Sequence, residues 1–296
     1  MQRQIVYFLK WAWVVAVIVF IALLVQKRHI EFVEVIQQIN IFYLLFSFIC
    51  ILMAKSILPL FMRYVLLSIG KEMDFRSCFR IYNVTQLGKY IPGNIWHFVG
   101  KAAAYRNHKF SLGNIRDALV IENVWLVLSA FVYGLVLVFI FEHELILRFF
   151  SSYIYFVILF IFAVPLSFVL AQKLLKIDFR GIFSHHGLNL RIAVIQIFVW
   201  TLLGLGFAVL ALPFLPKEAC IFMMMGLYAI AFSIGFVTPF APAGIGVREG
   251  VLALGLLHYV PLEVIIIVSM ANRLLYLLVE IILASIAQFI PQSDHL

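Results

Sequence analysis

The stretch Ile41–Ile69, IFYLLFSFICILMAKSILPLFMRYVLLSI, decides the fold class of this chain. Its only charged residues are Lys55 and Arg63, and it is longer than the roughly 20 residues that an α-helix needs to cross a bilayer. A helix that is apolar on all sides belongs in lipid or in the interior of a helical bundle. We therefore expect Ile41–Ile69 to be a transmembrane helix.

The composition extends this expectation to the whole chain. Of its 296 residues, 65% are hydrophobic and only 12% are charged, whereas soluble domains have about 45–50% apolar and about 25% charged residues. The sequence thus predicts an integral membrane protein and excludes soluble enzymes and soluble binding modules. The excess of 22 Lys and Arg over 14 Asp and Glu is attributed to cytoplasmic loops, so nucleic acid is not a predicted partner.

Further apolar stretches predict an all-α, polytopic membrane helix bundle with seven or eight transmembrane segments. One stretch is too short to cross alone, so whether residues 250–260 cross fully or re-enter is left open. No linker sets apart a soluble domain, and residues 1–296 are expected to form a single integral membrane domain. The further stretches are Trp11–Val25, Ala118–Phe141, Tyr153–Leu170, Ile192–Leu215, Ile221–Val237, Val251–Leu257 and Ile265–Ile290.

Lysines and arginines in the loops predict the orientation. With the N-terminus in the cytoplasm, most of them fall on the inside, in residues 1–10, 71–116 and 173–191, which is the positive-inside pattern. The first span is expected to be retained, because no small-residue cleavage site precedes residues 26–28. We expect a multi-pass protein of the cell inner (plasma) membrane.

Two segments broken by proline and glycine echo each other along the chain. Residues 86–100 read QLGKYIPGNIWHFVG, and residues 236–250 read FVTPFAPAGIGVREG. Each contains a Pro-x-x-Ile core, and an asparagine follows each core at a nearly equal distance, inside an apolar stretch and beside a charged residue. These positions are Pro92 with Asn123 and Pro242 with Asn272, and they indicate repeat halves of about residues 41–141 and 192–290.

Broken backbone in a membrane segment has a chemical meaning. Proline removes an amide donor, and glycine permits turns that other residues resist. At bilayer depth such backbone must be shielded by protein or line a wet cavity, and broken elements in corresponding halves are typical of a transporter's binding site. A half-helix beginning after Gly246 would aim free N–H groups at an anion. The alternative, two tight interfacial turns, is left open.

Both segments resemble signatures of a known family. Residues 88–96, GKYIPGNIW, and residues 242–250, PAGIGVREG, look like the two signature regions of the lysylphosphatidylglycerol synthase transmembrane-domain family. That family includes the flippase half of bacterial multiple peptide resistance factors and many stand-alone members. The resemblance covers most of the chain from the second span onward. It implies a polytopic bundle with two Pro/Gly-broken re-entrant elements that moves a lipid between leaflets.

This chain departs from the family pattern in two respects. The family commonly shows an acidic-basic pair where this chain has Glu122 followed by Asn123. The cytoplasmic aminoacyl-transferase half of the larger relatives has no counterpart in residues 1–296. We therefore expect the chain to handle a lipid and not to synthesise the aminoacylated form.

Ionisable residues inside spans are functional candidates by default, because they are costly in lipid. Arg273 and Glu280 are seven residues apart, on one helix face. Together with Lys89 and Arg248, Arg273 is expected to bind a phosphate-bearing headgroup through charge-assisted hydrogen bonds. The predicted substrate-binding residues are Lys89, Asn94, Glu122, Asn123, Gly244, Arg248, Glu249, Asn272, Arg273 and Glu280.

Alternative roles stay open for several of these residues. Lys89 and Arg248 also fit positive-inside anchoring, and Glu249 fits ordinary compensation of a helix N-terminus. Lys55 fits a structural pair with a carboxylate, either Glu122 or Glu280, equally as well as a substrate contact.

The function that these patterns favour is a lipid flippase or transporter for an anionic lipid or a polyprenyl-phosphate-linked sugar. The alternative is an accessory subunit that holds a cytoplasmic glycosyltransferase, with residues 70–117 as the platform. A membrane-embedded transferase is less favoured, because the sequence contains no DxD, HExxH or GxSxG motif. No enzyme activity, metal or cofactor is predicted, and Cys50, Cys78 and Cys220 suggest no disulfide framework.

Overall fold

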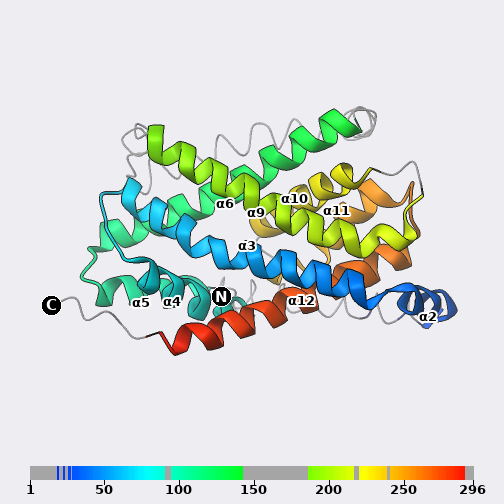
Figure 1. Cartoon of the computed structure of the whole chain (residues 1–296), viewed down its shortest axis with the longest axis horizontal. Helices are drawn as coiled ribbons and strands as arrows, with labels where there is room; N and C mark the ends of the chain where they lie inside the picture. Colours follow the sequence, from blue (N-terminus) through cyan, green and yellow to red (C-terminus); the bar gives the residue numbers. More distant parts are fainter. Residues whose placement is uncertain are drawn as a thin grey trace, which may run out of the picture.

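A computed structural model of the chain, drawn in Figure 1, is a bundle in which the long helices run roughly side by side. The structure describes residues 29–90, 95–142, 186–216, 220–238 and 241–290, together with Val19, Leu23, Gln26 and Lys27. Every regular element in these residues is a helix, which confirms the all-α class.

The elements alternate between long apolar helices and short helices around the two broken segments. They are α2 (His29–Gln38), α3 (Ile41–Ser68), α4 (Phe75–Gln86), η1 (Leu87–Tyr90), α5 (Trp96–Asn107), α6 (Leu112–Phe141), α9 (His186–Ala211), η2 (Leu212–Phe214), α10 (Ile221–Val237), η3 (Pro242–Gly244), α11 (Val247–Leu256) and α12 (Leu262–Gln288).

Four helical stretches in the described residues are long and apolar enough to cross a membrane: Ile41–Ser68, Leu112–Phe141, His186–Phe214 and Leu262–Gln288. They correspond to four of the predicted spans, and the shorter apolar helix α10 has the predicted bounds. The predicted Tyr153–Leu170 and, apart from Val19 and Leu23, Trp11–Val25 lie outside the described residues. The total of seven or eight spans remains a prediction, and whether residues 250–260 cross fully or re-enter stays open.

Polar side chains cap the start of two helices. α6 begins at Leu112, before the predicted Ala118, because the hydroxyl of Ser111 accepts a hydrogen bond from the backbone N–H of Asn114 at 3.2 Å. Asp74 caps α4 in the same way and accepts from the N–H of Ser77 at 3.1 Å. The hydrophilic stretch 70–117 is therefore largely helical rather than an irregular loop.

Helices from residues 29–142 pack against helices from residues 186–290. α3 packs along α9, while α4 packs against α12 and α10 packs against α6. At the α6–α10 contact a Cβ on Gly134 would lie only 2.6 Å from the carbonyl oxygen of Gly226, so the two backbones meet where both residues lack a side chain. Residues 41–141 and 186–290 each begin and end with a long helix, and that they are repeat halves remains a prediction.

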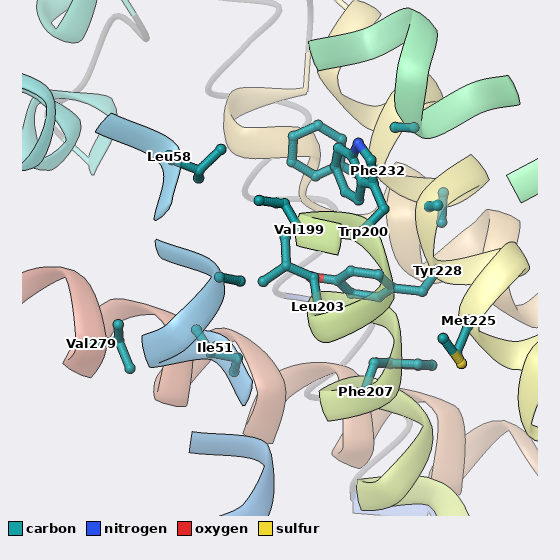
Figure 2. Close-up of a cluster of buried hydrophobic side chains, with 14 of the residues drawn as sticks. Ile51, Leu58, Val199, Trp200, Leu203, Phe207, Met225, Tyr228, Phe232 and Val279 are labelled. Atoms are coloured by element: carbon teal, nitrogen blue, oxygen red, sulfur yellow. The ribbon is translucent and has the colours of Figure 1, made fainter. Parts of the chain in front are cut away.

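A layer of aromatic side chains between α9 and α10 forms part of the core, as Figure 2 shows. Trp200 lies 4.7 Å from Phe232 between ring centroids, and Phe207 stacks on Tyr228 at 5.0 Å. The indole N–H of Trp200 donates to the hydroxyl of Ser129 at 3.0 Å, which satisfies a buried donor. Phe232 also lies against the guanidinium of Arg248. This part of the core therefore helps to position one of the predicted substrate-binding residues.

Candidate functional site

The first broken segment is tied to α12 by a buried carboxylate. Glu280 accepts a hydrogen bond from the ammonium of Lys55 at 2.6 Å and another from Lys89. The side chains of Lys55 and Glu280 are each 3% exposed, whereas that of Lys89 is 19% exposed. This decides between the two predicted partners of Lys55 in favour of Glu280. Lys89 is therefore part of a buried ion-pair cluster and more than a loop anchor.

Two tyrosines complete this cluster. The hydroxyl of Tyr90 donates to the second carboxylate oxygen of Glu280 at 2.8 Å. The ring of Tyr276 lies 4.0 Å from the Lys55 ammonium and 4.8 Å from that of Lys89, both within cation–π range. The site thus provides an aromatic surface shared by two cations.

The second broken segment is tied to the same helix, α12, about two turns from Glu280. The guanidinium of Arg273 donates to Glu249 at 2.8 Å and to the carbonyl oxygen of Gly244 at 3.3 Å. Gly244 is buried and has a φ of 70°, a left-handed conformation that glycine adopts without strain. Its backbone can therefore turn so that its carbonyl faces Arg273.

The start of α11 differs from the expected anion seat. The N–H of Gly246 donates to the carboxylate of Glu249 at 2.8 Å, so the helix caps itself. This supports the alternative role of Glu249 in compensating the helix N-terminus. The carboxylate serves two elements at once, because it also accepts from Arg273.

In the described residues, Arg248 packs against an aromatic ring and forms no direct ion pair with a carboxylate. Its guanidinium lies over the ring of Phe232 at 4.4 Å, and its buried Nε has no hydrogen-bond partner among the described residues. A Cβ on Gly235 or Gly244 would lie within 3 Å of this side chain. The two glycines therefore make room for the arginine between α10 and η3.

Both broken segments meet one face of α12. Glu280 and Arg273, which contact η1 and the η3–α11 region respectively, are separated by about 10 Å of helix rise. That the segments also enclose a polar pocket remains a prediction.

The site carries an excess of positive charge. Burying charges without compensation is costly, so such an excess favours an anionic ligand. Four cations stand against two carboxylates in the set Lys55, Lys89, Arg248, Arg273, Glu249 and Glu280.

A separate ion pair lies beside the first broken segment. The ammonium of Lys101 on α5 donates to Glu122 on α6, and their side chains are 4% and 7% exposed. Lys101 also lies over the ring of Tyr82 at 4.5 Å. The predicted site residue Glu122 therefore belongs to a sealed pair, and its basic partner comes from another helix instead of the next position in the sequence.

The two matching asparagines have different surroundings. Asn123 donates to the carbonyl oxygen of Leu119, one turn back in its own helix, at 2.6 Å. Asn272 is 4% exposed, and its Nδ2 has no partner among the described residues. Asn272 thus lies beside Arg273 on α12 with an unused donor. The predicted site residue Asn94 lies outside the described residues, as does Pro92.

Sequence reasoning missed three groups that the structure assigns to these clusters: Lys101, Tyr90 and Tyr276. Lys101 was grouped with the basic loop, although its separation of 21 residues from Glu122 resembles the 24 residues between Glu249 and Arg273. Within the described residues no group of three or more His, Cys, Asp or Glu side chains is arranged to hold a metal ion.

The comparisons with known proteins agree with this architecture. The sequence matches the family described as "Lysylphosphatidylglycerol synthase TM region" over residues 10–284, nearly the whole chain. The chain belongs to this family of multi-pass membrane proteins, which confirms the resemblance and indicates a role in lipid or cell-envelope chemistry. A search of curated proteins gives no match.

Proposed function

We propose that this protein is a flippase-like carrier that moves an anionic lipid, or a polyprenyl-phosphate-linked sugar, between membrane leaflets. The observation that carries the proposal is the positive excess where both broken segments meet α12. A phosphate oxygen accepts charge-assisted hydrogen bonds from ammonium and guanidinium groups. An anionic headgroup would therefore be stabilised between Lys89, Arg248 and Arg273.

The two faces of α12 suit the two parts of a lipid. Polar residues follow one stripe at spacings of three or four residues: Ser269, the adjacent Asn272 and Arg273, Tyr276 and Glu280. Apolar side chains that are 45–66% exposed follow the adjacent stripe, Met270, Leu274, Leu278 and Ile281. A headgroup on the polar stripe would leave its acyl or prenyl chain beside the apolar stripe, in contact with lipid.

The proposal includes a carrier role without covalent chemistry, in the cell inner membrane with the N-terminus in the cytoplasm. The buried carboxylates Glu122 and Glu280 are each bonded to lysine, and Glu249 is bonded to arginine. Carboxylates engaged in this way are poor general bases, so a transferase mechanism has little support from the site. A cytoplasmic glycosyltransferase stays a proposed partner that would consume the moved lipid.

Reconstitution tests the proposal directly. Liposomes with and without purified protein receive a fluorescent anionic lipid, and a membrane-impermeant quencher reports how fast the label changes leaflet. We expect faster redistribution with protein, and slower redistribution of a zwitterionic lipid with the same chains. Equal rates with and without protein would refute the carrier function. Full redistribution by an Arg273→Ala variant would instead show that the carrier does not need this arginine to bind the headgroup.

A further inference from the structure

Glu280 accepts more donors than its charge requires. One carboxylate binds two ammonium groups, those of Lys55 and Lys89, and the hydroxyl of Tyr90. A single negative charge thus balances one of the two lysines. The other lysine is held by a contact that a second anion can replace without leaving Glu280 unpaired.

Lys55 is the permanent partner of the carboxylate. Both side chains are 3% exposed, and their polar atoms are 2.6 Å apart. Lys55 lies in the middle of α3, far from either end of the helix. Separating this pair would leave two uncompensated charges in the bundle, which is strongly unfavourable.

Lys89 and Tyr90 are the replaceable partners. They belong to η1, a helix of only four residues, and Lys89 is 19% and Tyr90 43% exposed. Both are thus accessible from outside the core while they bind Glu280. An anion that takes these two donors would release η1 from α12 and leave the Lys55–Glu280 pair intact.

A second cation is available to that anion. The Nε of Arg248 has no hydrogen-bond partner among the described residues. It lies beside Gly244, whose carbonyl oxygen binds Arg273, about two turns from Glu280 on α12. Lys89 and Arg248 together offer two positive charges once Glu280 is displaced from Lys89. Two negative charges match them, and a phosphate monoester or a diphosphate carries two where a phosphodiester carries one.

We infer that Glu280 occupies the place of a substrate phosphate, and that the headgroup that displaces it from Lys89 and Tyr90 is doubly charged, a phosphate monoester or a diphosphate. The inference rests on the proposed function and names the class of lipid end that it handles. Because the carboxylate competes with the ligand, a singly charged phosphodiester binds more weakly. Displacement also links headgroup binding to the release of η1.

Two soluble lipids with the same tails test this inference. Dihexanoyl phosphatidic acid is close to dianionic at pH 8, and dihexanoyl phosphatidylglycerol is monoanionic. Binding to the purified full chain in detergent is followed by intrinsic tryptophan fluorescence. We expect the wild type to bind the monoester about tenfold more tightly than the diester, a difference of about 1.4 kcal/mol.

Substitutions at Glu280 then test the displacement itself. Glu280→Gln removes the competing charge, so both lipids should bind the variant more tightly than they bind the wild type. The Lys55→Met/Glu280→Gln double variant removes the unpaired lysine as well and serves if the single variant does not fold. Glu72→Gln, the matched control, removes an exposed carboxylate outside the site and should change neither affinity.

The outcomes separate this inference from the proposed function. Equal binding of the two lipids by the wild type, or no binding of either, would overturn the inference. Weaker binding by both Glu280 variants would overturn the displacement. If the binding results are as expected while liposomes show no lipid movement, the site is a doubly charged phosphate site, and only the carrier function is refuted.

Discussion

The two broken segments are each followed by a short helix that is ion-paired to the next long helix, but with opposite polarity. In the first, the cation Lys101 is on the short helix α5, and the anion Glu122 is on α6. In the second, the anion Glu249 is on α11, and the cation Arg273 is on α12. The partners are 21 and 24 residues apart, so the two pairs are similarly placed along the chain.

The difference in exposure separates two roles for this arrangement. Lys101 and Glu122 are 4% and 7% exposed, whereas Arg273 and Glu249 are 30% and 16% exposed. Holding a short helix against a long one needs opposite charges but no particular polarity. We therefore assign the sealed pair to stability, and the accessible pair, whose arginine faces the broken backbone, to ligand contact.

Breaking the sealed pair should have the largest effect. Lys101→Met leaves Glu122 as an unpaired buried charge, which costs about 3–5 kcal/mol. Thermal unfolding in detergent should show a large loss of stability. The double variant Lys101→Met/Glu122→Leu, which removes both charges, should recover most of it. A single variant as stable as the wild type would contradict the assignment to stability.

Arg273→Ala should affect transport more than folding. The lost guanidinium bound Gly244 and, by our proposal, the headgroup, so we expect the leaflet-exchange rate to fall about tenfold, or about 1.4 kcal/mol. Arg76→Ala is a matched control, because Arg76 is an exposed arginine on α4. Equal losses of transport and of unfolding temperature would instead make Arg273 structural, like Lys101.

Glu249→Gln should have a smaller effect that sharpens the comparison. The amide oxygen can still accept from the N–H of Gly246, so the cap remains while the charge near the helix N-terminus is lost. Such charges contribute about 0.3–1 kcal/mol. We expect a loss of stability in this range, measured by thermal unfolding. A loss as large as that of Lys101→Met would refute the difference between the pairs.

The asparagines should show the smallest effect on stability. Asn272→Leu removes a buried Nδ2 that has no partner among the described residues, so we expect the free energy of unfolding to change by less than about 0.5 kcal/mol. Asn123→Leu removes a hydrogen bond within the helix and serves as the control. A lower transport rate only for Asn272→Leu would place its amide on the headgroup path.

Much of the fold could be predicted from apolar runs, because hydrocarbon imposes length and composition on a spanning helix. The bounds of α10 follow from its sequence alone, and the spacing of Arg273 and Glu280 correctly places them along one face of α12. Helix ends such as Leu112 could not be predicted from hydropathy, because a polar cap at Ser111 decides them.

The pairing of charges could be predicted only in part. Both possible partners of Lys55 were evident, but choosing Glu280 over Glu122 requires knowing that α3 packs against α12. The burial of Lys101 has no local signal, because its neighbours in sequence are typical of a basic loop. The self-capping of α11 by Glu249 was one of two open readings, and geometry alone distinguishes them.

The partners Lys55 and Glu280 are 225 residues apart, and this separation has a consequence for biosynthesis. α3 enters the membrane early with a lysine near its centre, at a cost of a few kcal/mol that its apolar residues must outweigh. The compensating carboxylate reaches the bilayer only when α12 is made. A nascent chain stalled before α12 therefore exposes an orphan charge, by which cellular surveillance could distinguish unfinished molecules from finished ones.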